Sequence, residues 1–250
     1  MIRVALAQIF YKPAIIEKHV DHLAEPGLFL HGSCTASLLE MLPEEKSVQL
    51  QTLHNQIREQ YITYINKKLE SICKGVCRIY EPDILVFPEY STPYQCLPRI
   101  KELSEQLGIT IVAGTHTVIP AAQEYYTQAG FDSQVASNYK GCSISPVFFP
   151  DKEPDFQVKN DRSIFEITMR ESEDGFKQFN AVTRSGEPYS FSIIICADTL
   201  TMSTAGKADI GLTDAEYDNF MVITVACSTK PKAFENTANM FALHGIPMLL

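Results

Sequence analysis

Short apolar runs, rich in β-branched residues and separated by helical patterns, are the feature that most constrains the fold of this chain. They lie at residues 2–9, 84–87, 110–113, 143–149, 190–195, 220–226 and 246–250. Most are nearly continuous rather than alternating, which is typical of strands buried on both faces. Because helical patterns lie between several of these strands, the sequence predicts an α/β or layered α-β fold.

Three helices are predicted from the spacing of apolar residues. The longest runs from about Ser47 to Tyr80, with Ser47 as its N-cap and apolar side chains at steps of three or four. Those apolar positions are Leu50, Leu53, Ile57, Tyr61, Ile65, Leu69, Ile72 and Val76. A second helix fits Leu97–Leu107 and a third fits Lys232–His244, each followed by a glycine of the kind that ends helices.

Composition limits the class of protein. A chain of 250 residues, 45% of them apolar, can bury a substantial core without disulfides or metals. A net charge of −9 argues against a nucleic-acid or anionic-membrane partner, and no apolar stretch approaches the ~20 residues of a membrane span. The seven cysteines lack the framework of a secreted protein. We interpret them as reduced thiols of a cytoplasmic protein.

The whole chain, 1–250, is predicted to form one domain. Within it, the weakly patterned stretch Phe10–Lys46 contains several prolines and glycines, and a connection this long is usually functional or an insertion. A second polar stretch, Arg170–Glu187, is interpreted as a surface excursion that leads into the next strand.

Three side chains with complementary chemistry stand where predicted strands end. Cys196 closes the run Phe191–Ile195, Glu89 closes the run at 84–87 after a proline, and Lys159 follows a strand-like run and an acidic turn. In open α/β sheets the carboxyl ends of strands line the ligand crevice. Each residue alone has a simpler interpretation: a buried structural cysteine, a capping or paired acid, and a surface lysine. The functional hypothesis depends on the three occurring together.

The chain resembles the nitrilase, or carbon–nitrogen hydrolase, superfamily. The resemblance covers almost the whole chain in the family's order. It is carried by Arg3–Gln8, Pro82–Glu89, Phe149–Lys159, Ile194–Asp198 and Phe234–Leu250. The resemblance implies a four-layer α-β-β-α sandwich and a Glu-Lys-Cys triad.

The roles of individual residues follow from that resemblance. Cys196 is the expected nucleophile and Glu89 the general base, while Lys159 and the backbone N–H of Ala197 are expected to hold the oxyanion. Glu166 has the spacing of the second glutamate that several members use, with a surface acid as the equal alternative. The implied function is hydrolysis of a non-peptide C–N bond in a small amide, carbamoyl compound or nitrile through a cysteine acyl-enzyme, without any cofactor. We expect an amidase rather than a true nitrilase, acting as a homo-oligomer or a fused domain.

The chain departs from the family pattern in three places. The segment between Gln8 and Glu89 is longer than expected, which identifies about 10–46 as an insertion. Ala197 stands where an aromatic residue is common. The sequence ends at Leu250, before the strands with which the family normally completes its second sheet. We therefore expect those C-terminal strands to be missing and the second sheet to be completed by other residues, as in a longer polypeptide.

Other functions remain open at this point. The chain could be a nitrilase-like sensing or scaffolding module of a larger multidomain protein, or a glutamine-amidotransferase-like cysteine hydrolase that uses His244. A zinc site is the third alternative, because it would need four side chains of the right type. These are His19, His22, His31 and Cys34. Their spacing is not that of a common zinc finger, and the resembled family needs no metal.

Overall fold

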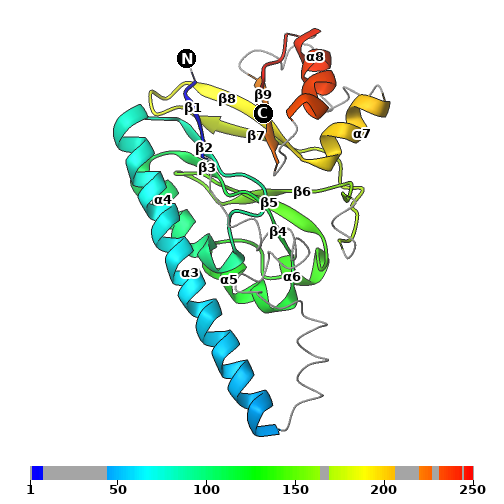
Figure 1. Cartoon of the computed structure of the whole chain (residues 1–250). Helices are drawn as coiled ribbons and strands as arrows, with labels where there is room; N and C mark the ends of the chain where they lie inside the picture. Colours follow the sequence, from blue (N-terminus) through cyan, green and yellow to red (C-terminus); the bar gives the residue numbers. More distant parts are fainter. Residues whose placement is uncertain are drawn as a thin grey trace.

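The protein is described by a computed structural model that covers residues 2–7, 44–163, 169–205, 220–226, 231–243 and 245–249. It has a mixed α/β fold with two mixed sheets (Figure 1). The first sheet has the order β1 (Val4–Leu6), β2 (Ile84–Val86), β3 (Thr110–Val112), β5 (Ser143–Phe148), β4 (His116–Thr117), with β6 (Asp155–Val158) paired to β5. The second has the order β10 (Met248–Leu249), β9 (Phe220–Val225), β8 (Pro188–Ile195), β7 (Gln178–Val182).

Strand direction places the candidate residues. Strands β1, β2 and β3 are parallel, and β5 is antiparallel to β3, β4 and β6. In the second sheet β8, β9 and β10 are parallel, whereas β7 is antiparallel to β8. Glu89, Lys159 and Cys196 each follow the carboxyl end of a strand: β2, β6 and β8 respectively. Because β6 and β3 are both antiparallel to β5, the carboxyl ends of β2 and β6 lie at the same edge of the first sheet.

Helices cover the outer face of each sheet (Figure 1). The first sheet carries α3 (Glu44–Tyr80), α4 (Leu97–Leu107), α5 (Gln123–Gln128) and α6 (Val135–Asn138), with the short 3₁₀ turns η2 (Tyr94–Cys96) and η3 (Pro120–Ala122). The second sheet carries α7 (Ala197–Ala205), η5 (Pro231–Phe234) and α8 (Glu235–Leu243). The N-terminal half of α3, drawn in blue and cyan, extends away from the two sheets.

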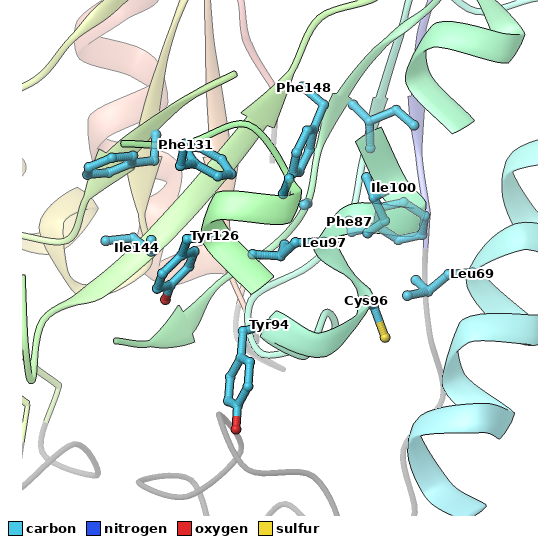
Figure 2. Packing of buried hydrophobic residues seen from close by; sticks show 14 of the residues in the cluster. Leu69, Phe87, Tyr94, Cys96, Leu97, Ile100, Tyr126, Phe131, Ile144 and Phe148 are labelled. Carbon is cyan, nitrogen blue, oxygen red and sulfur yellow. The ribbon is translucent and has the colours of Figure 1, made fainter. Parts of the chain in front are cut away.

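Three apolar clusters hold these layers together. The first joins the helices α3–α6 to the first sheet, and Figure 2 shows Leu69 projecting into it from α3. The second lies between the sheets and combines residues such as Val86 and Val112 with Phe191 and Ile223. The third joins the second sheet to α8 through Val222 and Phe241. The alternation of side chains along each strand explains why one strand contributes to two clusters.

Much of the helix prediction is confirmed, with two differences. Helix α4 runs over Leu97–Leu107 as predicted and ends at Gly108, which has the left-handed φ of 64°. Helix α3 begins at Glu44, so Ser47 lies inside the first turn and the predicted N-cap is wrong. In the third predicted helix, residues 231–234 form a 3₁₀ turn before α8 begins.

The prediction for the polar stretch Arg170–Glu187 is wrong in part. Residues 178–182 form β7, which pairs with β8 along its length and has one buried side chain, Phe179. The expected insertion at about 10–46 lies almost entirely outside the described residues, and its last three residues belong to α3. Among the described helices, none has the length and apolar character that crossing a membrane requires.

Candidate active site

The turn that carries Glu89 contains a residue in the left-handed backbone conformation. The chain leaves β2 through Phe87, whose N–H still bonds to the carbonyl of Val112, and Glu89 follows two residues later. Tyr90 then adopts a φ of 57°, which is uncommon for a residue with a side chain. The Tyr90 N–H donates to the Thr115 Oγ1 at 3.1 Å, which ties this turn to the segment between β3 and β4. Glu89 is 2% exposed.

The close approach of two segments at this turn requires glycine at position 114. Gly114 has a φ of 72°, and a Cβ added there would lie 2.3 Å from the Pro88 carbonyl oxygen and 2.6 Å from the Ser91 Oγ. Any larger residue would push the Pro88–Ser91 turn away from the sheet. Gly114 is therefore a structural requirement for the position of Glu89.

Lys159 lies beside Glu89, although β3 and β5 separate the two strands that these residues follow. It follows β6, and its backbone N–H donates to the Ser143 carbonyl at 2.9 Å, so β5 fixes where it leaves the sheet. Its Nζ lies 2.7 Å from the Glu89 Oε1. Both side chains are buried, with 0% and 3% of their surface exposed. A buried charge needs a partner, and each of these supplies the other's.

Cys196 lies in the turn from β8 into α7. Its N–H donates to the Val225 carbonyl at 3.0 Å, and its carbonyl accepts from the Thr199 N–H at 3.0 Å. Its φ of 42° is again a left-handed conformation in a residue other than glycine, so the turn is strained. Cys196 is partly exposed and packs against the apolar cluster between the sheets.

Ala197 is the first residue of α7. The first N–H groups of a helix have no acceptor within the helix, and the helix dipole makes them favourable for negative charge. The position of Ala197 is therefore compatible with the expected role of its N–H as an oxyanion donor.

Asp198 connects the Cys196 turn to the Lys159 segment. Its Oδ1 accepts the Asp161 N–H at 2.7 Å and the Asn160 N–H at 3.2 Å, and its Oδ2 lies 3.3 Å from the same Asn160 nitrogen. These bonds join residues that lie one or two positions after Lys159 to a residue two positions after Cys196. They run between the two sheets, because β6 belongs to the first and β8 to the second.

Burial controls the ionisation of Asp198, which is 0% exposed. Removal from water raises the pKa of its carboxyl from 3.8 to about 7. The bonds from the Asp161 and Asn160 N–H groups and the charge of Lys159 act in the opposite direction. The carboxyl therefore changes charge near neutral pH.

The structure brings two of the three predicted catalytic side chains into contact and bonds the turn of the third to the same segment. Glu89 and Lys159 form an ion pair, and Cys196 is linked to them through Asp198. Glu166 lies outside the described residues, as do His244 and the four side chains considered for zinc. Within the described ranges, no cluster of His, Cys, Asp or Glu is suited to hold a metal ion.

The sequence alone indicates no role for Asp198, Gly114 or Thr115. Asp198 is visible there as an acid close after the candidate nucleophile. Its partners are backbone N–H groups, however, and a sequence pattern does not show those. Gly114 carries a weak signal, since a glycine after a strand often marks a close approach of backbone.

No family model matches the sequence, and no curated protein matches it. Solved structures do. An N-terminal amidase is 14% identical with a TM-score of 0.45, over 73% of this chain and 50% of that chain. The CN-hydrolase superfamily protein XC1258 from Xanthomonas campestris, solved with an arsenic adduct in its active site, is 10% identical with a TM-score of 0.45, over 73% of this chain and 65% of that chain. Each match covers 73% of this chain but less than two thirds of the length of the solved chain.

Proposed function

We propose that this chain is a nitrilase-like, four-layer α-β-β-α domain that hydrolyses a non-peptide C–N bond of a small amide, carbamoyl compound or nitrile. The observation that supports it most is the buried Lys159–Glu89 pair, with 2.7 Å between Nζ and Oε1. A buried ion pair is weak evidence for stability, because its desolvation offsets much of its attraction. A catalytic base beside a fixed positive charge gives such a pair a use.

With an amide or carbamoyl substrate, the acylation step uses all three side chains. Glu89 takes the proton of the Cys196 thiol, and the thiolate attacks the substrate carbonyl carbon. The charge that develops on the carbonyl oxygen is stabilised by the Lys159 ammonium and the Ala197 N–H. Collapse of this intermediate breaks the C–N bond, and the leaving amine takes the proton from Glu89. The product is a thioester on Cys196.

Deacylation reverses these roles. Glu89 accepts a proton from water, and the resulting hydroxide attacks the thioester carbon. The same two donors stabilise the second oxyanion. The sulfur leaves with the proton held by Glu89, which releases a carboxylic acid and restores the thiol. The reaction needs no cofactor, because water is the only co-reactant.

The experiment is a measurement of ammonia release from a panel of small amides, carbamoyl compounds and nitriles. Turnover should be abolished by Cys196→Ala and reduced by at least about 10²-fold by Glu89→Gln, since general acid-base catalysis typically contributes that much. A thioester intermediate adds the acyl mass to the Cys196 peptide, which mass spectrometry detects. Lys74→Gln, in a partly exposed ion pair with Glu70 on α3, is the control and should leave turnover unchanged.

The same experiment separates hydrolysis from ligand sensing. A sensing module would bind a member of the panel without releasing ammonia or adding mass to Cys196. Saturable binding of an amide that survives in Cys196→Ala, without any turnover in the original chain, would replace the hydrolase proposal by the sensing one.

A further inference from the structure

One buried carboxylate close to the proposed catalytic residues has no role in the chemistry of acylation or deacylation. Asp198 is 0% exposed, and its oxygens accept the backbone N–H groups of Asn160 and Asp161. It therefore acts on the chain that carries Lys159, and it stands on the turn that carries Cys196.

Each side of this contact is bonded to its own sheet. The Lys159 backbone N–H bonds to Ser143 in the first sheet, and the Cys196 N–H bonds to Val225 in the second. Strand pairing in the described chain does not join the two sheets. Other hydrogen bonds between the sheets, such as that from the Tyr189 hydroxyl to the Thr110 Oγ1 at 3.2 Å, lie near the amino ends of β8 and β3. Those accepted by Asp198 lie beyond the carboxyl ends of β6 and β8, where they join the two segments that carry Lys159 and Cys196.

We propose that Asp198 is the positioning residue of the candidate active site, holding the backbone after Lys159 against the turn that carries Cys196. The proposal deepens the proposed hydrolysis and rests on it. An Asp198 that lets go of Asn160 and Asp161 would allow the Lys159–Glu89 pair to move away from the nucleophile. Positioning of this kind has large effects on rate, because a small misplacement weakens every interaction made in the transition state.

The contact depends on charge. Hydrogen bonds from N–H groups to an ionised carboxylate are shorter and stronger than those to a neutral acid. Two titratable groups around Asp198, Lys159 and Asp161, lie in the segment after β6. The others are Cys196, just before the helix α7 that contains Asp198, and Glu89, which is paired to Lys159. On α8, which packs against α7, Glu235 is exposed. Ionisation of Asp198 strengthens these two bonds, whereas burial of the charge acts in the opposite direction and raises the pKa of the carboxyl to about 7.

The test uses iodoacetamide as the probe, because it reports on Cys196 without requiring a substrate. The rate of Cys196 alkylation is measured from about pH 5.5 to about pH 9, a range that spans thiol ionisation, in the original chain, in Asp198→Asn and in Asp198→Ala. Asp151→Asn, an exposed aspartate in the turn before β6, is the matched control. Hydrogen exchange of the peptide that contains residues 159–161 is followed in the same samples.

We expect Asp198→Ala to slow Cys196 alkylation at pH 7 by about tenfold, which corresponds to one pKa unit of lost thiolate stabilisation. Exchange at Asn160 and Asp161 should become faster. Asp198→Asn retains one acceptor oxygen, so its alkylation rate should fall between those of the original chain and of Asp198→Ala. In this variant the protection of the Asn160 and Asp161 amides against exchange should no longer change with pH near pH 7. The control should match the original chain in both measurements.

An unchanged alkylation profile and unchanged exchange in a folded Asp198→Ala protein would overturn the proposal. If that variant does not fold, Asp198→Asn decides alone, because a profile identical to the original chain contradicts positioning by the charge. Failure of hydrolysis is a separate outcome. In that case ammonia release is absent, while Cys196 alkylation and the exchange of residues 159–161 still change in the Asp198 variants.

Discussion

Two opposite charges are buried together at Glu89 and Lys159, and neither can lose its partner without consequence. Replacing Glu89 with Gln leaves a buried ammonium beside a neutral amide, which should reduce the free energy of unfolding by about 3–5 kcal/mol. The double replacement, Glu89→Gln with Lys159→Met, should lose less than the sum of the single ones. Urea denaturation measures all four values of the cycle.

The exposed pair of Lys177 and Asp155 is the control for this cycle, with the same 2.7 Å between charged atoms but 37% and 46% of the side chains exposed. Lys177→Met should change stability by less than about 1 kcal/mol. Equal losses at the two pairs would show that burial does not control the strength of the first.

The raised pKa of Asp198 predicts the pH dependence of stability. A carboxyl with a folded pKa of about 7 and an ordinary value of 3.8 binds more protons in the folded state between these pH values. Its contribution to the free energy of unfolding is therefore fully present below about pH 3.8. This contribution, about 4 kcal/mol, is lost as the pH rises through about 7. Asp198→Asn, which cannot ionise, should gain stability relative to the original chain over this range. Thermal unfolding at pH 5 and pH 8 measures it, and a relative stability that falls instead would contradict the burial of a charge.

Reactivity should distinguish Cys196 from the other described thiols. Burial raises the pKa of Cys73 to about 12 and raises the pKa values of Cys77 and Cys96. Cys142 is also buried, whereas Cys196 is partly exposed. Limited iodoacetamide treatment near neutral pH followed by peptide mapping should find Cys196 labelled first. Preferential labelling of Cys96 or of Cys34 would count against a reactive nucleophile at 196.

Among the elements, the turn after β2 is the most sensitive to a single methyl group. Gly114→Ala should be destabilising by about 2 kcal/mol or more, because it combines a left-handed φ with a Cβ 2.3 Å from the Pro88 oxygen. Gly186→Ala separates the two effects, since Gly186 has a φ of 87° but open space around it. The difference between the two variants in chemical denaturation measures the clash. Equal losses would mean that the turn carrying Glu89 moves aside without resistance.

Sequence patterns predict an element when the signals that define it lie within its own segment. Helix α4 is predictable to the residue because its apolar face and terminal Gly108 are local signals. Strand β7 escapes prediction because four of its five side chains are polar or partly exposed, and it is a strand only through its pairing with β8. A start of helix α3 at Ser47 is a reasonable expectation because serine is a common cap, whereas Glu44 and Glu45 fill the acidic first turn instead.

At the scale of the molecule, the cluster between the sheets should make them unfold as one unit. Phe191 is fully buried there and stacks on Phe179 and Tyr189, with ring centroids 5.3 and 6.0 Å apart. Phe191→Ala should lower the free energy of unfolding by about 3–5 kcal/mol while leaving a single transition of unchanged m-value. Two separate transitions in urea would show instead that the sheets form independent domains.

The candidate site is predictable only as far as strand ends can be read. The strand ends identify Glu89, Lys159 and Cys196 as candidates, and the resemblance assigns a role to each. The contact between Glu89 and Lys159 depends on how β2 and β6 lie in one sheet, with β3 and β5 between them. Asp198 and Gly114 act through backbone atoms, so only the folded chain shows what they do.

Among the side chains of helix α3 that the structure describes, the buried ones lie at every fourth position: Ile65, Leu69, Cys73 and Cys77. Four residues turn a helix by about 400°, so this stripe winds about 40° further around the axis at each step. Substitutions on the exposed faces leave the stripe intact. Loss or gain of one residue between positions 65 and 77 would rotate everything on one side of the change by about 100°. The length of this segment is therefore more constrained than the identity of most residues within it.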